Sequence, residues 1–342
     1  MAYAGVLDDI KKCINLQVPE RLPVFALSEE FDVRMADEMY CRFDSDAEVM
    51  SRVIIDTVKK YDYDWAWLQV DDCIVYEILG VGCEGSGNIL RATRKYLPAT
   101  NETLRSLRIP DFKKKGRAPA FLEAISRVRE AFGDTVCVCG RVEAPFSSVG
   151  LTFGLTETMA LIFDAPGFLK EACKFFKDLQ IEFGRMQKEA GAHALWYGDC
   201  NAGSHLISLN HYKEFAYPYA GEVAKACKEM GIMTIYHASE DKLPFIDTMA
   251  DMDIDILSLG ENTDIVAAHR LIRNKKCICG NIDPIQLLQR GTPEMIRNEV
   301  KRIIENVSIK GGHIMNSGEM IPRDVPEENM IAYLTSARRF WK

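Results

Sequence analysis

The 342-residue chain lacks several features that would each assign it to a particular class of protein. It has no run of about 18 apolar residues, so no membrane-spanning helix is expected. Acidic residues outnumber basic ones and give a net charge of -8, which argues against nucleic acid as a partner because phosphate binding needs a basic surface. No internal repeat, low-complexity tract or linker interrupts the chain, which predicts a single domain over residues 1–342.

The chain also lacks the features of a small exported protein. Its 11 cysteines are odd in number and dispersed, unlike a disulfide framework. Residues 1–9 contain no basic segment followed by an apolar stretch. Hydrophobic residues make up 47% and charged residues 27%, which is ordinary for a soluble globular enzyme. We therefore expect a protein of the reducing cytoplasm.

What the chain does contain is an alternation of strand-like and helix-like segments. The helical patterns lie at 46–61, 118–132 and 166–190, and Thr292 with Pro293 begins a further helix. The strand-like apolar segments are 23–27, 64–70, 136–142, 193–198, 232–237, 254–259, 276–280 and 312–316. This alternation predicts a parallel sheet, and eight strands favour an α/β fold of the (β/α)8 TIM-barrel type with an N-terminal helical extension.

Two longer segments do not follow the repeat. Residues 80–117 contain Gly-rich and Lys-rich stretches, and residues 143–165 suggest a loop with a short helix. Both are predicted to be long loops that cover an active site, because long loops in compact domains usually carry function.

Polar side chains follow the expected strands at the end where barrels of this type keep their chemistry. His237 ends one strand and is followed by Ser239 and Glu240. A metal ligand and a hydrogen-bonded histidine at the barrel mouth are both open interpretations of His237. The other candidates at these strand ends are Glu319, Glu261, Asp199, Cys200, Glu143, Asp71 and Asp72.

Several other residue types are open to a structural interpretation. The Cys-x-Cys pairs at 137/139 and 277/279 lie within strands without a nearby His, which favours packing over metal binding. For the aromatic residues on strands, substrate stacking and core packing are equally compatible. These aromatic residues are Trp65, Trp67, Trp196 and Tyr197.

Four ordered segments carry a resemblance to a known family. They are Pro19 to Val24, then Leu206 to Ser208 with Phe215, Pro218 and Tyr219, then Cys279 to Pro284 with Gly291 to Glu294, and finally Ser317 to Pro322 with Val325 to Asn329. Together they resemble segments of the uroporphyrinogen decarboxylase superfamily, and the resemblance spans nearly the whole chain.

The resemblance implies one of two chemistries. The decarboxylase branch carries paired arginines after the first strand, whereas this chain has Glu29 and Glu30 there, which would repel a polyanionic substrate. The cobamide-dependent methyltransferase branch uses a zinc motif of His-x-Cys after the fifth strand and a Cys after the eighth. The corresponding residues here are His237, Ser239 and Glu319, so the chain keeps the histidine and departs at both cysteines.

This second branch implies zinc as a cofactor and a separate corrinoid protein as a partner. The residues predicted to hold zinc are His237, Glu319, Cys200 and Glu261, with Asp199 and Glu143 as catalytic residues. Because carboxylate ligands leave zinc more Lewis-acidic than thiolates, we expect an O-methyl substrate, such as an aromatic methyl ether, to donate its methyl group to Co(I).

Three alternatives stay open on the sequence. The first is transfer in the other direction, from a methylated corrinoid to a thiol. The second is a metal-free lyase that resembles the decarboxylases, and the third is a barrel that binds a ligand without catalysis. Homodimer formation is also compatible with the sequence.

Overall fold

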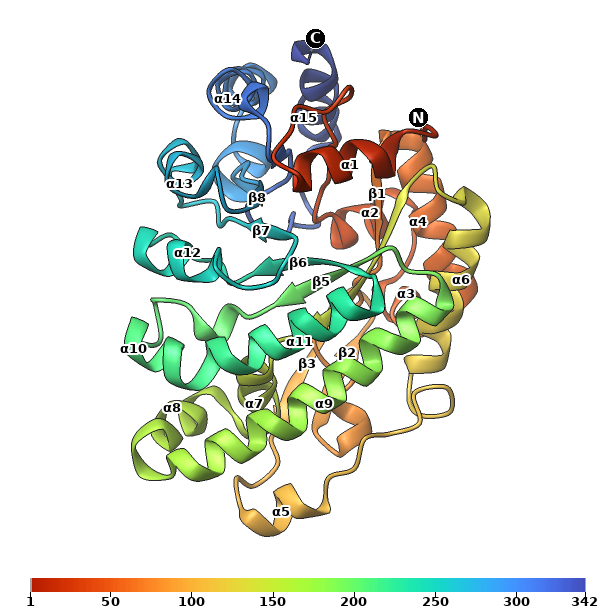
Figure 1. Ribbon diagram of the computed structural model, residues 1–342. Coiled ribbons are helices and arrows are strands. Elements are labelled where there is room, and N and C mark those ends of the chain that lie inside the picture. The colour runs from red at the N-terminus through yellow and green to blue at the C-terminus, as the bar shows by residue number, and fades with distance from the viewer. Residues whose placement is uncertain (1, 342) are drawn as a thin grey trace.

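The computed structural model describes residues 2–341 and is built around one parallel sheet of seven strands (Figure 1). The strand order is β1-β4-β5-β6-β7-β8-β9. The strands are β1 Trp65–Trp67, β4 Cys137–Glu143, β5 Ala194–Gly198, β6 Met233–His237, β7 Ile256–Ser258, β8 Cys277–Cys279 and β9 His313–Ile314. Each overlaps a segment predicted as a strand, because buried parallel strands are continuous apolar runs.

The segment at 23–27, predicted as a strand, is not one of the seven strands of this sheet. This segment forms only an isolated parallel bridge, between Val24 and Met315. It nevertheless bonds to the chain at both edges of the sheet: the Phe25 amide donates to the Met315 carbonyl at 2.8 Å, and the Asp64 amide donates to the Val24 carbonyl at 3.0 Å. Pro23 has no amide hydrogen to extend the ladder. The fold is therefore α/β with a curled parallel sheet, and closure by an eighth strand stays a prediction.

Helices surround the sheet on its outer side (Figure 1). The predicted helices at 46–61, 118–132 and 166–190 are confirmed, and Asp46 and Thr292 cap helix N-termini through their side chains. The α-helices are α1 Val6–Ile14, α2 Glu29–Met35, α3 Tyr40–Phe43, α4 Ala47–Tyr61, α5 Asn101–Ser106, α6 Ala118–Phe132, α7 Pro145–Phe153, α8 Leu155–Asp164, α9 Pro166–Ala190, α10 Leu209–His211, α11 Tyr217–Met230, α12 Leu243–Met249, α13 Ile265–Ile272, α14 Pro293–Asn306 and α15 Glu327–Phe340. Short π-helical turns occur at Tyr212–Ala216 and Pro284–Gln289.

The two segments predicted as long loops contain regular structure. Residues 80–117 form an antiparallel hairpin of β2 Gly82–Ser86 and β3 Ile89–Lys95, followed by α5. The hairpin turn needs Gly87, which has a φ of 59°, a conformation that glycine adopts readily. Residues 143–165 are mainly α7 and α8. Gly87 of this segment thus serves the tight turn of the hairpin.

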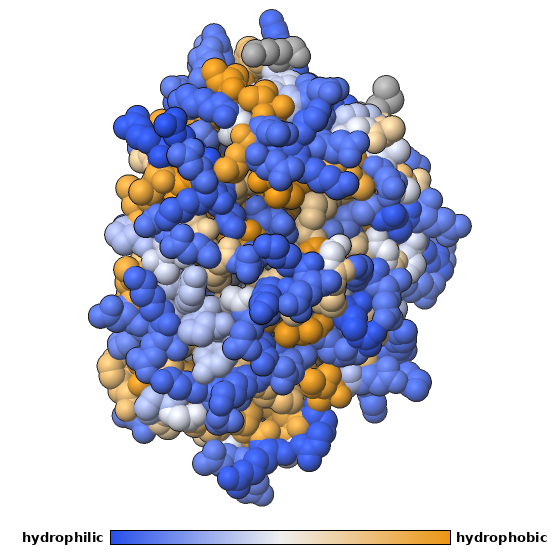
Figure 2. All heavy atoms as spheres, in the orientation of Figure 1, coloured by the Kyte–Doolittle hydropathy of each residue, from blue (hydrophilic) through white to orange (hydrophobic). Residues whose placement is uncertain are grey.

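Within residues 2–341, no single helix has both the length and the apolar character to cross a membrane, although α7 and α8, bent by 113° at their junction, meet these criteria as a pair. Most of α7 is buried inside the molecule. Figure 2 shows a face on which hydrophilic residues predominate and hydrophobic residues occur in small groups between them.

Candidate functional site

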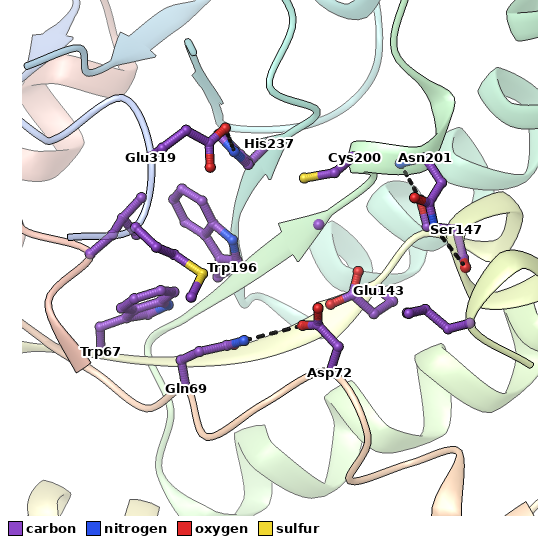
Figure 3. Close-up of a pocket in the computed structure, with 14 residues that line it drawn as sticks. Trp67, Gln69, Asp72, Glu143, Ser147, Trp196, Cys200, Asn201, His237 and Glu319 are labelled. Atoms are coloured by element: carbon purple, nitrogen blue, oxygen red, sulfur yellow. Dashed lines mark hydrogen bonds and ion pairs between the residues drawn. The ribbon is translucent and has the colours of Figure 1, made fainter. Parts of the chain in front are cut away.

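A cavity of about 130 Å³ opens where the parallel strands end (Figure 3). Its walls come from the ends of β1, β4, β5 and β6, from the segments that follow them, from the turn after β9, and from Leu27 before α2. The polar and aromatic residues that line it are Trp67, Gln69, Asp72, Glu143, Ser147, Trp196, Cys200, Asn201, His237 and Glu319. This is the end of the sheet at which the sequence predicted the site.

Three of the four predicted metal ligands meet at one side of this cavity. His237 Nε2 lies 3.0 Å from Glu319 Oε1, although the two residues are 82 positions apart. Ser239 Oγ lies 3.2 Å from the same nitrogen and 3.3 Å from Cys200 Sγ. The other ring nitrogen, Nδ1, faces Ser258 Oγ at 3.1 Å. Ser239 therefore joins the imidazole–carboxylate pair to an exposed thiol.

The charges of this pair stabilise each other. Burial lowers the pKa of His237, but the negative charge of Glu319 and the contact with Cys200 outweigh it and raise the pKa to about 10. Burial raises the pKa of Glu319, but the positive charge of His237 and the hydrogen bond between the two side chains outweigh burial. The pKa of the Glu319 carboxyl is therefore lower than its ordinary value. In this state the two side chains form an ion pair.

Glu261, the fourth predicted ligand, lies beside this cluster and outside the cavity lining. Its carboxylate accepts a hydrogen bond from Asn262 at 2.8 Å. Its backbone packs against Gly318, where an added Cβ would lie 2.4 Å from the Glu261 nitrogen. Across residues 2–341, no three His, Cys, Asp or Glu side chains are already grouped to hold a metal ion. Imidazole nitrogen, carboxylate oxygen and thiolate sulfur are nevertheless all donors that zinc accepts, so the residue types at His237, Glu319 and Cys200 fit that metal.

Asp199 is fully buried behind the cavity wall. Its carboxylate accepts hydrogen bonds from Ser147 Oγ at 2.7 Å and Tyr236 Oη at 2.5 Å. Burial raises the pKa of Asp199 to about 7 against the opposing effect of these hydroxyl groups. Asp199 is linked to the cavity through Ser147, which lines it. The Nδ1 atom of His237 faces Ser258, whereas the carboxylate of Asp199 binds Ser147 and Tyr236.

Glu143 and Asp72 form an acidic wall held by one buried arginine. Arg141, 3% exposed, makes ion pairs with Glu143 and, at 3.1 Å, with Asp72, and it donates to the Asp71 carbonyl. Gly198 lets Glu143 approach β5, because a Cβ there would lie 2.7 Å from Glu143 Oε2. Arg141 was not predicted as a site residue from the sequence. It lies within an apolar strand, and no neighbouring residue in the sequence indicates that its side chain supports the cavity wall.

Aromatic rings complete the cavity. The rings of Trp67 and Trp196 pack edge to face at 5.7 Å, and the Trp196 ring lies 4.9 Å from that of His237. Both indoles line the cavity, whereas Trp65 packs behind them against Phe25 at 4.3 Å. Trp67 and Trp196 are thus largely buried but line the cavity, so substrate stacking on them stays a prediction, whereas Trp65 packs in the core.

Comparison with known proteins defines the family. The family model for uroporphyrinogen decarboxylase (URO-D) matches residues 7–340, so the chain belongs to that family. The chain is 25% identical to a uroporphyrinogen decarboxylase from Methylococcus capsulatus, over 95% of each protein. It is 26% identical to a methylated-thiol–coenzyme M methyltransferase from Methanosarcina mazei, over 67% of this chain and 60% of that protein.

Further similarities lie on the methyltransferase side. A methylcobamide:CoM methyltransferase from Methanosarcina acetivorans is 24% identical over 66% of this chain and 65% of that protein. A solved methyltransferase structure from Methanosarcina mazei superposes with a TM-score of 0.90, covering 98% of this chain and 99% of that one at 19% identity. The predicted family is confirmed. The chain is an enzyme whose relatives include methyltransferases as well as decarboxylases.

Proposed function

We propose that this enzyme is a zinc-dependent methyltransferase that moves a methyl group from a small O-methyl compound to Co(I) of a separate corrinoid protein. The observation that carries the proposal is the cluster of His237, Glu319 and Cys200 at one cavity. It combines the histidine of the methyltransferase branch with two other zinc donors. The relative named methylcobamide:CoM methyltransferase supports chemistry with a corrinoid.

The walls of the cavity favour methyl transfer over decarboxylation of a tetrapyrrole. Among the described residues that line the cavity none is Lys or Arg, and three are the acids Asp72, Glu143 and Glu319. The one buried arginine beside it, Arg141, is already paired with two carboxylates. A substrate with several carboxylates would meet repulsion here. The volume of about 130 Å³ also suits a small molecule.

In the proposed site, His237, Glu319 and Cys200 would hold zinc, and Glu261 would support the Glu319 turn. Bound there, zinc would act as a Lewis acid toward an ether oxygen. Zinc ligands that comprise one thiolate and one carboxylate are harder donors than two thiolates. The metal they hold therefore favours an oxygen substrate over a thiol.

The remaining residues bind the substrate and supply a proton. In the reaction, the methyl–oxygen bond breaks, Co(I) provides the electron pair of the new methyl–cobalt bond, and the departing oxygen takes up a proton. Asp199 would deliver this proton through the Ser147 hydroxyl, the group that links it to the cavity. Glu143 would contact the substrate from the end of β4. A proton supplied at the oxygen matters because an alkoxide or phenoxide is a poor leaving group.

Metal analysis tests the proposal first. After reconstitution with zinc, the wild type is expected to contain about one zinc per chain, and His237→Ala and Glu319→Ala are expected to lose it. Glu143→Gln is the matched control, because Glu143 lines the same cavity through a different set of contacts. Zinc retained in both ligand variants, or lost equally in the control, would contradict the proposed site.

Turnover tests the reaction itself. An aryl methyl ether and a Co(I) corrinoid protein are mixed with the enzyme, and methyl–cobalt formation is followed by absorbance together with release of the phenol. Release of carbon dioxide from a porphyrinogen would instead support the lyase. Methylation of a thiol by the methylated corrinoid, without ether cleavage, would support transfer in the opposite direction.

Three further expectations accompany this proposal. The sheet closes into an eight-stranded barrel with residues 23–27 as the eighth strand, supported by the bonds of Val24 and Phe25 to both sheet edges. The chain forms one domain, and it works in the cytoplasm.

A further inference from the structure

The cavity combines aromatic rings with carboxylates in a way that ether chemistry alone does not require. The indoles of Trp67 and Trp196 form one part of its lining, and the carboxylates of Asp72 and Glu143 form another (Figure 3). The faces of indole rings attract cations, Trp more strongly than other aromatic residues. Carboxylates attract the same charge. The two kinds of wall therefore share one preferred ligand, a cation.

The charges of this wall do not cancel among its own residues. Asp72 and Glu143 together carry two negative charges, and Arg141, held between them, supplies one positive charge. A small monocation in the cavity would balance the remaining charge, whereas an anion would be repelled. The Asp72 carboxylate is the accessible part of the wall, because its side chain is 61% exposed, whereas Glu143 is 13% and Arg141 is 3% exposed.

Two buried polar groups in the lining lack a partner, and a ligand that carries a polar oxygen beside its charged group could bind them. Gln69 is 4% exposed, and within the described chain its Oε1 accepts no hydrogen bond. Trp67 Nε1 is likewise buried and donates to no atom of residues 2–341. Buried polar atoms without a hydrogen-bond partner are uncommon in folded proteins, since each one lowers the stability of the folded state. Gln69 lies next to the acidic wall, with its Nε2 3.4 Å from Asp72 Oδ1 (Figure 3).

We propose that the methyl donor carries a methylated ammonium group, bound by Trp67 and Trp196 on their rings and by Asp72 and Glu143 through charge. This inference rests on the proposed function, since the cation is taken to be the methyl donor. Two sources share this chemistry. One is a methyl ether with an ammonium tail, whose departing oxygen needs a proton. The other is a quaternary ammonium compound, in which the carbon–nitrogen bond breaks and a neutral amine leaves with the electron pair.

Calorimetric titration with choline and its carbon isostere 3,3-dimethyl-1-butanol tests the binding step. The two probes differ in the charge of one atom and hardly in shape. We expect choline to bind at least about tenfold more tightly. In Asp72→Asn this preference is expected to fall at least about threefold, because the wall loses one charge. Asp72 is largely exposed, so the variant should fold, which circular dichroism checks.

The matched control is Glu157→Gln. Glu157 is an exposed acid in the first turn of α8 and is not part of the cavity lining, so its variant removes the same charge elsewhere. We expect its preference for choline to equal that of the wild type. Equal affinity for the two probes in the wild type, or an unchanged preference in Asp72→Asn, would overturn the inference.

Methyl transfer to a Co(I) corrinoid protein distinguishes the two sources. Transfer from choline methyl ether, but not from tetramethylammonium, would assign the donor as an ether, and the opposite result would assign it as a quaternary ammonium compound. A preference for choline without any methyl transfer would support the cation site while contradicting the proposed function. Efficient transfer from neutral ethers, with no preference for choline, would overturn the cation site alone.

Discussion

Asp32 is a buried acid whose ionisation should make the stability of this protein fall as the pH rises. It lies in α2, where Ser28 Oγ donates to it at 2.7 Å and Tyr63 Oη donates at 3.1 Å. Burial raises its pKa from 3.8 to about 7, against the opposing effect of these hydroxyl groups. The nearby titratable groups, Tyr61 and Tyr63, have pKa values raised above their ordinary range, so neither ionises between pH 5 and pH 8.

The sign of the effect follows from this direction. The folded pKa lies above the unfolded one, so the folded state holds the proton more tightly. The contribution to stability is complete below about pH 4 and is lost as the pH rises through about 7. With 1.36 kcal/mol for each pKa unit, the part lost between pH 5 and pH 8 is about 2–3 kcal/mol. An asparagine has no proton to lose and should remove this part of the dependence.

Urea unfolding at pH 5 and pH 8, followed by circular dichroism, measures the effect. The fall in unfolding free energy from pH 5 to pH 8 should be about 2–3 kcal/mol smaller in Asp32→Asn than in the wild type. Any hydrogen bonds that the asparagine amide fails to make lower the unfolding free energy equally at pH 5 and at pH 8. This loss therefore cancels in the difference between the two pH values. Asp37→Asn is the control, because Asp37 is exposed just after the same helix. An Asp32→Asn variant with the pH dependence of the wild type would refute the reasoning.

Two further predictions concern the residues that support the cavity. Gly140→Ala should destabilise the protein by roughly 2–3 kcal/mol, because the new Cβ would lie 2.0 Å from Gln187 Oε1. That oxygen accepts a hydrogen bond from the backbone of β4. The control Gly167→Ala has open space around the new Cβ and should be neutral or slightly stabilising. Equal thermal midpoints for both variants would contradict this. Tyr236→Phe should lower stability by about 1–3 kcal/mol, since Asp199 loses one of its two hydroxyl donors. A thermal midpoint equal to that of the wild type would show that this hydroxyl contributes nothing.

Individual helices and strands were predictable because the patterns that indicate them involve only residues close together in the sequence. The helix at 118–132 has the predicted bounds, since its apolar residues recur with the helical period and Pro119 lies in its first turn. The strand at 193–198 was recognisable as a short apolar run that begins and ends with polar residues or glycine. The segment at 23–27 carries a similar apolar run, and only its pairing, which involves residues about 40 and 290 positions away, determines that it forms a single bridge.

Some residues of the candidate site were likewise predictable from their position in the sequence, and others were not. His237, Glu143 and Cys200 were found because each follows a strand, and in a parallel sheet all such ends meet at one edge. Glu261 follows a strand as well, yet its carboxylate turns toward Asn262, and strand position alone does not predict a side-chain direction. Gln69, Ser147 and Asn201 line the cavity without any motif that would mark them.

The sequence by itself determined the family, the order of strands and helices, and the edge of the sheet at which the polar residues gather, because periodicity and strand-end position are properties of neighbouring residues. Only the tertiary structure decided which side chains touch. The contact of His237 with Glu319, the placement of Arg141 between Asp72 and Glu143, and the indole lining all join distant segments. Such contacts depend on how the strands are packed and on the directions of their side chains, and no local pattern contains that information.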